Sequence, residues 1–142
     1  MTRVLVVAHR TAATPALLDA VRARAQAGQA TFTLLVPRQA HGMHKLVDPE
    51  DSGFEEARAV LDLALPLLEE AAGAPVEGLI GDADPINAVH DAVNAHGFDE
   101  IIISTLPSRV SKWLRLDLPH KVAGLGLPVT TVTAQGREHA AV

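Results

Sequence analysis

The sequence predicts an α/β domain built on a parallel sheet, and three observations carry that prediction. Short aliphatic and β-branched runs alternate along the chain with segments of helical periodicity. Apolar residues make up 48% of the chain and aromatic residues only 3%, so the core must be aliphatic. A capping residue precedes a proline at Thr14-Pro15 and at Asp84-Pro85, which is typical of helix starts. Strands that alternate with helices form βαβ units, in which helices cover both faces of a parallel sheet.

Five apolar segments are expected to form the strands. They are continuously apolar rather than alternating, as strands covered on both faces usually are. Pro37 should end the second strand, because proline has no N–H to donate to the ladder. Three consecutive isoleucines make the fourth strand the strongest signal. The five segments are Arg3–Ala8, Thr31–Val36, Val76–Ile80, Phe98–Thr105 and Pro128–Val132.

Four helices are expected between these strands. The first follows Pro15 and ends at Gly28, and the third follows Pro85 and ends at Gly97. The capping-box pattern Ser52-Gly53-Phe54-Glu55 predicts the start of the second, which should reach about Gly73. Pro66 should kink or break that helix. The fourth is expected somewhere between Asp117 and Ala123.

The remaining segments predict a single domain with a tail. Residues 38–51 are polar and aperiodic, which indicates a surface loop. Residues 135–142 are expected to form a disordered tail. The chain of 142 residues is long enough for one core and too short for two ordinary domains, so residues 1–134 should form one unit.

Composition excludes several classes of function. The chain has no cysteine, which excludes disulfides, thiol nucleophiles and cysteine-ligated metals. A formal net charge of -5 argues against a general nucleic-acid binder. The amino terminus lacks a signal-peptide pattern, and no apolar run approaches the ~20 residues of a membrane span. We therefore expect a cytoplasmic protein with neither nucleic acid nor membrane as its partner.

The ligand site is expected beyond the carboxyl ends of the strands, where the strand order reverses. The end of the first strand supplies Ala8, His9 and Thr11. The segment 104–123 follows the fourth strand and has four basic residues against one acidic residue, a local net charge of +3. Hydroxyl and cationic groups suit phosphate or carboxylate ligands. The candidates in this segment are Ser104, Thr105, Ser108, Arg109, Ser111 and Lys112.

Each candidate also has a structural interpretation. Arg109, Lys112 and Arg115 recur near helical spacing, so they could form a solvated face while Val110, Trp113 and Leu114 pack inward. Trp113 is expected to anchor the loop rather than stack on a base. His9 is either a surface or capping residue or a ligand contact.

Two further sets of polar residues are expected to be structural. Asp82 and Asp84 should cap the third helix rather than act as catalytic carboxylates. The histidines His41 and His44 lie in the predicted loop, and His90 and His96 lack helical i, i+4 spacing. We therefore expect no metal site.

Three longer motifs carry a resemblance to a known family. The turn from Gly81 to Ile86, the phrase HGFDEIIIST and the closing GLGLPVTTV resemble the universal stress proteins. The resemblance implies a Rossmann-like three-layer α/β/α sandwich with a five-stranded parallel sheet in the order 3-2-1-4-5. It also implies a homodimer often built through the last strand and, in one subgroup, ATP bound at the strand ends.

The chain departs from the pattern of the ATP-binding subgroup. That subgroup carries an aspartate after the first strand and three spaced glycines followed by a hydroxyl residue after the fourth. The corresponding residues are His9, Ser104, Pro107, Asp117 and Leu118. Glycines let backbone amides approach an oxyanion, and proline has no amide to offer. The backbone hydrogen bond that the fold offers an adenine would fall near Val36.

The sequence favours a non-enzymatic, homodimeric stress-response module that binds a nucleotide or another small anionic ligand. ATP or another adenine nucleotide is the cofactor that the resemblance allows. One alternative is a dimeric protein-interaction module that has lost nucleotide binding. A second is a nucleotide-dependent transferase or weak ATPase, since His9 and Ser111-Lys112 faintly resemble nucleotidyl-transferase motifs. The dimer is expected to pair through the edge strand around residues 128–133, because an uncovered edge exposes backbone groups.

Overall fold

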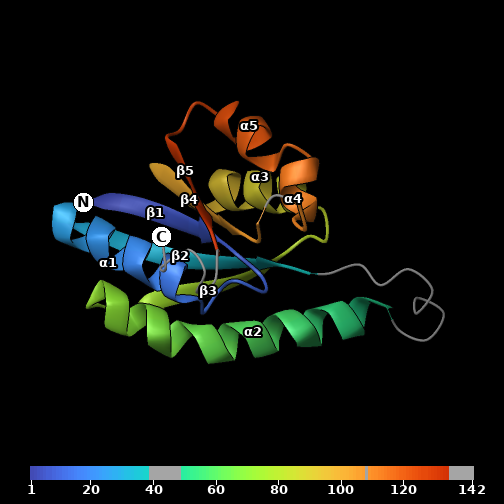
Figure 1. Ribbon diagram of the computed structural model, residues 1–142, viewed down its shortest axis with the longest axis horizontal. Helices are drawn as coiled ribbons and strands as arrows, with labels where there is room; N and C mark the ends of the chain where they lie inside the picture. The colour runs from blue at the N-terminus through green and yellow to red at the C-terminus, as the bar shows by residue number, and fades with distance from the viewer. Residues whose placement is uncertain (39–48, 108, 135–142) are drawn as a thin grey trace.

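The protein is a three-layer sandwich with one parallel sheet between two layers of helices (Figure 1). The computed structural model describes residues 1–38, 49–107 and 109–134, with the backbone alone at residues 49–52. The five strands lie in the order β3-β2-β1-β4-β5, and every neighbouring pair is parallel. The predicted fold class and strand order are therefore confirmed.

All five predicted strands form, with ends that differ by a few residues. Pro37 is the last residue of β2, where it pairs in register with Gly81, rather than the residue that follows the strand. The fourth strand begins at Glu100, two residues after Phe98. The strands are β1 (Thr2–Val7), β2 (Ala30–Pro37), β3 (Val76–Gly81), β4 (Glu100–Thr105) and β5 (Val129–Thr133).

The five described helices divide between the two faces of the sheet (Figure 1). One face packs on two long helices, and the other on α3 with the short helices that follow β4. The first pair is α1 (Pro15–Ala27) and α2 (Pro49–Ala72), and the second group is α3 (Pro85–His96), α4 (Lys112–Arg115) and α5 (Leu118–Ala123).

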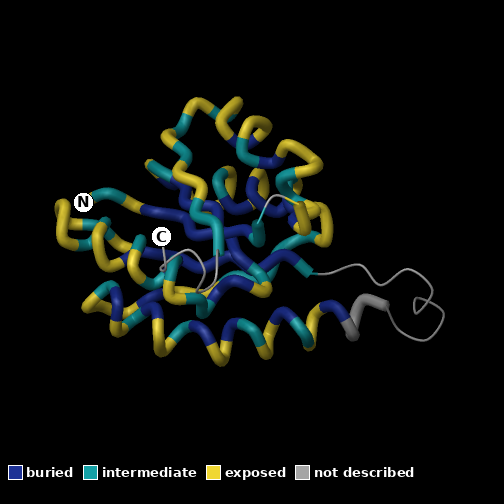
Figure 2. Tube along the Cα trace, viewed as in Figure 1, coloured by how far each residue is buried: buried dark blue, intermediate teal, exposed yellow. Residues whose placement is uncertain are grey.

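Alternation along the strands builds a core on each face. Val4, Val6 and Ile102 face α1 and α2, whereas Leu5 and Ile103 face α3 and α5. All five side chains are buried, and Figure 2 shows the buried residues concentrated along the central strands. The central strands are thus covered on both sides, which explains why their sequences are continuously apolar.

The two predicted residues, Thr14 and Asp84, both occupy the N-cap position of a helix, but only the Asp84 side chain accepts a hydrogen bond from its helix. The carboxylate of Asp84 accepts a hydrogen bond from the Ile86 N–H at 2.9 Å, and Asp82 accepts one from the Asp84 N–H at 2.9 Å. The first contact confirms that Asp84 caps α3, whereas Asp82 bonds the N–H of the cap residue itself and does not cap the helix. Thr14 is the N-cap residue of α1, but its hydroxyl donates to the Thr11 carbonyl at 2.9 Å instead of accepting from the helix.

The prediction for the start of α2 was wrong. The helix begins at Pro49, three residues before Ser52, because a proline at the first helical position lacks only an N–H that would have no helical partner. Of the kink or break predicted at Pro66, the break does not occur, because α2 runs without interruption from Pro49 to Ala72. Pro66 is exposed, and buried residues before and after it, Leu61 and Leu68, pack both halves of one helix against the sheet.

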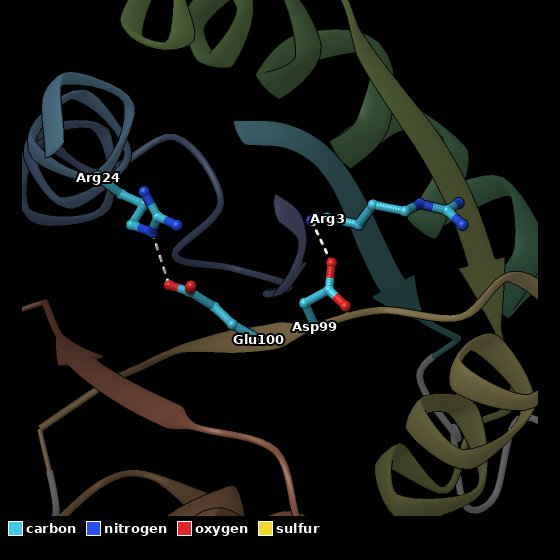
Figure 3. Close-up of polar contacts among 4 residues, drawn as sticks. All are labelled: Arg3, Arg24, Asp99 and Glu100. Carbon is cyan, nitrogen blue, oxygen red and sulfur yellow. Dashed lines mark hydrogen bonds and ion pairs between the residues drawn. The ribbon is translucent and has the colours of Figure 1, made fainter. Parts of the chain in front are cut away.

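Polar contacts connect residues at the amino-terminal ends of β1 and β4 (Figure 3). The Arg24 guanidinium of α1 forms an ion pair with Glu100 of β4 at 2.9 Å, and both side chains are mostly buried. The Arg3 N–H donates to the Asp99 carboxylate at 2.9 Å, and the Arg3 guanidinium lies 5.3 Å from the centre of the Phe98 ring. These contacts lie at the edge of the sheet opposite the carboxyl ends of the strands.

None of the helices in the described ranges is long and apolar enough to cross a membrane. The predicted tail at 135–142, the histidines His41 and His44, and Ser108 lie outside the described residues.

Candidate functional site

A cavity of about 230 Å³ opens at the carboxyl ends of the strands, beside the reversal point between β1 and β4. The loops after β1, β2, β3 and β4 all contribute residues to its lining, as expected for a sheet of this order. Its lining comprises His9, Arg10, Thr11, Pro37, Arg38, Ala83, Pro85, Ser104, Thr105, Leu106, Val110, Ser111, Lys112, Trp113 and Leu116. We refer to this space as the strand-end cavity.

Four of the lining residues are buried and carry hydroxyl groups, and we call these four the floor of the strand-end cavity. The Thr11 and Ser104 oxygen atoms lie 2.6 Å apart and share a hydrogen bond that joins the β1 loop to β4. The Ser111 hydroxyl accepts from the Leu114 N–H at 3.1 Å and so caps α4. Among the described residues, the Thr105 hydroxyl has no hydrogen-bond partner, although Thr105 is only 3% exposed. Three of the four hydroxyls thus have a hydrogen-bond partner within the protein, whereas the Thr105 hydroxyl has none among the described residues.

Three cationic side chains lie around the mouth of the cavity. Arg10 and Lys112 are exposed, and Arg38 is half-buried. Arg38 Nε donates to the Gly81 carbonyl at 3.3 Å, which fixes this side chain across the end of β3. The described lining contains no aspartate or glutamate. The mouth therefore favours an anion electrostatically, against the negative charge of the whole chain.

An apolar wall formed by the segment after β4 completes the cavity. Trp113 packs against the core under α3 and α5 and also lines the cavity, so it anchors the segment as predicted. Val110 was expected to pack inward, but it is 53% exposed. The Val110 N–H donates to the Pro107 carbonyl in a turn before α4, and the single turn of α4 buries none of its own residues.

The structure brings together six of the ten predicted site residues. His9, Thr11, Ser104, Thr105, Ser111 and Lys112 line the strand-end cavity. Ala8 and Val36 are fully buried in the sheet beneath it and do not line it. Arg109 is exposed and also lies outside the lining.

Sequence reasoning missed Arg10 and Arg38, which line the cavity. Both follow a strand by no more than three residues: Arg10 comes after β1 and Arg38 directly after β2. Their positions after strands could have predicted that they line the site, because parallel strands place the residues after their carboxyl ends at a shared edge.

Asp117 keeps a backbone conformation that glycine usually supplies. Its φ of 61° and ψ of 38° make it the one non-glycine residue with positive φ in the described part of the chain. The family pattern places its third glycine at this position. The carboxylate of Asp117 lies outside the cavity lining and contacts the His120 ring nitrogen Nδ1 at 3.1 Å. The aspartate therefore preserves the turn without bringing its charge into the cavity.

A second cavity, of about 460 Å³, lies beside β3 and α3. Arg38 lines both cavities, but the second is also lined by the carboxylates of Asp82 and Asp91. An anion is therefore better accommodated in the strand-end cavity. Within the described residues, no group of three or more histidine, aspartate or glutamate side chains could hold a metal ion.

No family model matches the chain, and no curated protein sequence matches it. Solved structures do match. A universal stress protein in complex with cAMP is 18% identical, with a TM-score of 0.62 over 94% of this chain and 98% of that chain. The universal stress protein from Archaeoglobus fulgidus in complex with dAMP is 17% identical, with a TM-score of 0.60 over 93% and 97% of the two chains.

A universal stress protein family member from Arabidopsis thaliana with AMP bound is 15% identical, with a TM-score of 0.63. That match covers 97% of this chain and 95% of the other. The similarity spans nearly the full length of each protein. The chain therefore has the universal stress protein fold.

Proposed function

We propose that the protein is a non-enzymatic stress-response module that binds an adenine nucleotide or another small anionic ligand in the strand-end cavity. One observation carries the proposal: Arg10, Arg38 and Lys112 surround the mouth, and no carboxylate is present in the described lining. Guanidinium and ammonium groups pair well with phosphate. The bound cAMP, dAMP and AMP of the three similar structures support an adenine mononucleotide as the first ligand to test.

Titration calorimetry with AMP, cAMP and ATP tests the proposal. We expect saturable heat for at least one of them, weakened at high ionic strength because Arg10 and Lys112 are exposed to solvent. A protein that is folded by circular dichroism and gives no heat with all three would remove the nucleotide from the proposal.

A protein-interaction module that does not bind nucleotide is the second candidate function. Val110 and Leu116, at 53% and 46% exposure, place apolar side chains at the mouth of the cavity. Apolar groups exposed together can mark a protein contact. Absence of binding to every nucleotide tested, combined with a stable dimer, would favour this candidate.

The assignment as a non-enzyme is part of the same proposal. The buried hydroxyls of Thr11 and Ser104 bond to each other, so neither is paired with a base as a catalytic nucleophile would be. Hydrolysis of ATP that persists through repurification and falls in Lys112→Ala would instead establish the weak ATPase.

We also propose that two copies pair through β5. This strand is at the edge of the sheet, and Thr130 and Thr131 on it are exposed. An edge strand carries unpaired backbone groups that a second copy could satisfy.

A further inference from the structure

We propose that the ligand enters the strand-end cavity with its uncharged end first, so that this end hydrogen-bonds Thr105 while the anionic group stays at the mouth among Arg10, Arg38 and Lys112. This inference rests on the proposed function and adds the orientation of the ligand and the residue that recognises its uncharged part.

Thr105 is the residue on the floor whose bonding is incomplete. Its hydroxyl oxygen is buried and lacks a partner among the described residues, whereas Thr11, Ser104 and Ser111 all have partners. A buried hydroxyl without a partner is unfavourable and uncommon in native structures. A ligand with a hydrogen-bonding group on the floor would supply the missing partner.

The position of Thr105 is consistent with this role. It lies two residues after Ile103 in β4, so alternation puts its side chain on the face covered by α3, α4 and α5. Trp113, which packs on that same face, also lines the cavity. The hydroxyl of Thr105 and the ring of Trp113 therefore belong to the same side of the site, where a flat, polar-edged group could contact both.

The distribution of charged residues in the lining favours the mouth of the cavity for the anionic end of the ligand. The buried lining residues Thr11, Ser104, Thr105, Ser111, Pro37 and Pro85 include no lysine or arginine. A phosphate on this floor would lose water without gaining a lysine or arginine as its partner, which is unfavourable. At the mouth it would meet Arg10 and Lys112 and remain partly hydrated. Within the described part of the chain, neither of these two side chains forms an ion pair.

The volume of the cavity limits the ligand to a compact molecule. At about 230 Å³ it falls below the range of about 300–1,000 Å³ that holds drug-sized ligands. The chemical class that fits is a small amphipathic anion, with one charged group on a neutral, ring-sized body that carries hydrogen-bonding atoms. A nucleoside monophosphate fits this description only with its base inside the cavity and its phosphate at the mouth, because the whole molecule is drug-sized.

A matched pair of probes distinguishes the two ends of the ligand. Adenosine and AMP differ only in the phosphate, and each is titrated into wild type, Thr105→Val and Lys112→Ala. Thr105→Val should weaken both probes by the same factor, about 3-fold to 10-fold, because it removes one neutral hydrogen bond. Lys112→Ala should weaken AMP by about 2-fold to 5-fold and leave adenosine unchanged, because an exposed cation contributes little more than that.

The reverse pattern would overturn the orientation: if Thr105→Val weakens AMP and leaves adenosine unchanged, the phosphate lies on the floor. Equal affinities of wild type and Thr105→Val for both probes would exclude the role of Thr105, while the proposed function would stand. Failure of the wild type to bind either probe would overturn the orientation for nucleotides, and failure with the full nucleotide panel would overturn the nucleotide function as well.

Stability measurements separate recognition from a structural role. Without ligand, Thr105→Val should be at least as stable as wild type, since it replaces a hydroxyl that has no partner with a methyl group of similar size. Thr130→Val on exposed β5 is the matched control and should leave both affinities unchanged. If Thr105→Val does not fold, the comparison of Thr105→Ser with Thr105→Ala isolates the hydroxyl, and only Thr105→Ser should retain wild-type affinity within about 2-fold.

Discussion

The hydroxyl groups of Thr11 and Ser104 share a buried hydrogen bond across the two central strand ends, with their oxygen atoms 2.6 Å apart. Ser104→Ala should lower the free energy of unfolding by about 1–2 kcal/mol, because it leaves the Thr11 hydroxyl buried without its partner. Urea denaturation measures this change.

The double variant Thr11→Val/Ser104→Ala provides the control for that hydrogen bond. It removes both hydroxyls, so neither is left buried alone. Its loss of unfolding free energy should therefore be smaller than the sum of the losses in the two single variants, by about 0.5 kcal/mol or more. Strictly additive costs would show that the contact does not contribute to stability.

Gly78 and Gly81 of β3 allow helices to approach the sheet, but the two positions should differ in how well they tolerate an added Cβ. A Cβ built on Gly81 would lie 2.7 Å from the Cβ of Ala88 in α3, whereas one built on Gly78 would meet a terminal methyl of Leu61 at 2.9 Å. The Leu61 methyl can rotate away, and the Ala88 Cβ can move only with its helix. Gly81→Ala should therefore destabilise the fold by about 1–3 kcal/mol.

Gly78→Ala is the matched comparison. Its smaller clash is offset by the reduced freedom of the unfolded chain, which contributes about 0.4–1 kcal/mol, so the net change should be near zero. Thermal unfolding of the two variants side by side checks the order. Equal losses of stability would contradict the packing described for α3.

The ion pair between Arg24 and Glu100 should contribute more than a surface pair. Its side chains are 22% and 20% exposed, compared with 48% and 74% for Arg22 and Asp19. A double-mutant cycle to alanine should give a coupling energy of about 1 kcal/mol for the first pair and about 0.2–0.5 kcal/mol for the second. The coupling of the surface pair should vanish first as salt is raised.

Asp117 should tolerate glycine better than alanine. Its φ of 61° lies in the left-handed region, which costs a residue with a Cβ about 1–2 kcal/mol and costs glycine almost nothing. Asp117→Ala should be less stable than Asp117→Gly by about 1 kcal/mol in chemical denaturation. The opposite order would mean that this turn relaxes to negative φ in solution.

The fold was largely predictable because the central strands and their helices carry local signals that agree with each other. The isoleucine run of β4 and the Asp84-Pro85 start of α3 each specify an element before any tertiary contact forms. The start of α2 was mispredicted because two competing signals, Pro49 and Ser52, lie three residues apart. The single turn of α4 is too short to produce a periodic pattern.

The site was only partly predictable, because a strand-end cavity combines loops that are distant in sequence. Ser104 was found from its place after the isoleucines, but its bond to Thr11 spans 93 residues and leaves no local signal. Arg109 and Lys112 have the same charge and lie three residues apart, yet only Lys112 lines the cavity. That difference depends on the path of the turn before α4, which spacing alone did not reveal.

The backbone of β5 offers a direct test of the proposed dimer. The Pro128 carbonyl accepts a hydrogen bond from the Ile101 N–H, and the Ala134 N–H donates one to the Thr105 carbonyl. Both ends of β5 are therefore bonded to the backbone of β4. Because the N–H groups of a parallel strand alternate in direction, the N–H of Thr130 faces β4 and that of Thr131 faces away from it. Proline at these two positions therefore removes an N–H from opposite edges of one strand.

Thr131→Pro should disrupt pairing between copies while sparing the fold. We expect a sedimentation coefficient that falls from dimer to monomer at micromolar concentration, with a free energy of unfolding that changes by less than about 1 kcal/mol beyond the loss of the dimer itself. Thr130→Pro should instead lose about 1 kcal/mol or more, because it removes a bond to β4 within one chain. A wild-type protein that sediments as a monomer, or a Thr131→Pro variant that remains a dimer, would exclude pairing through β5, since the outward N–H groups would then have no role in association.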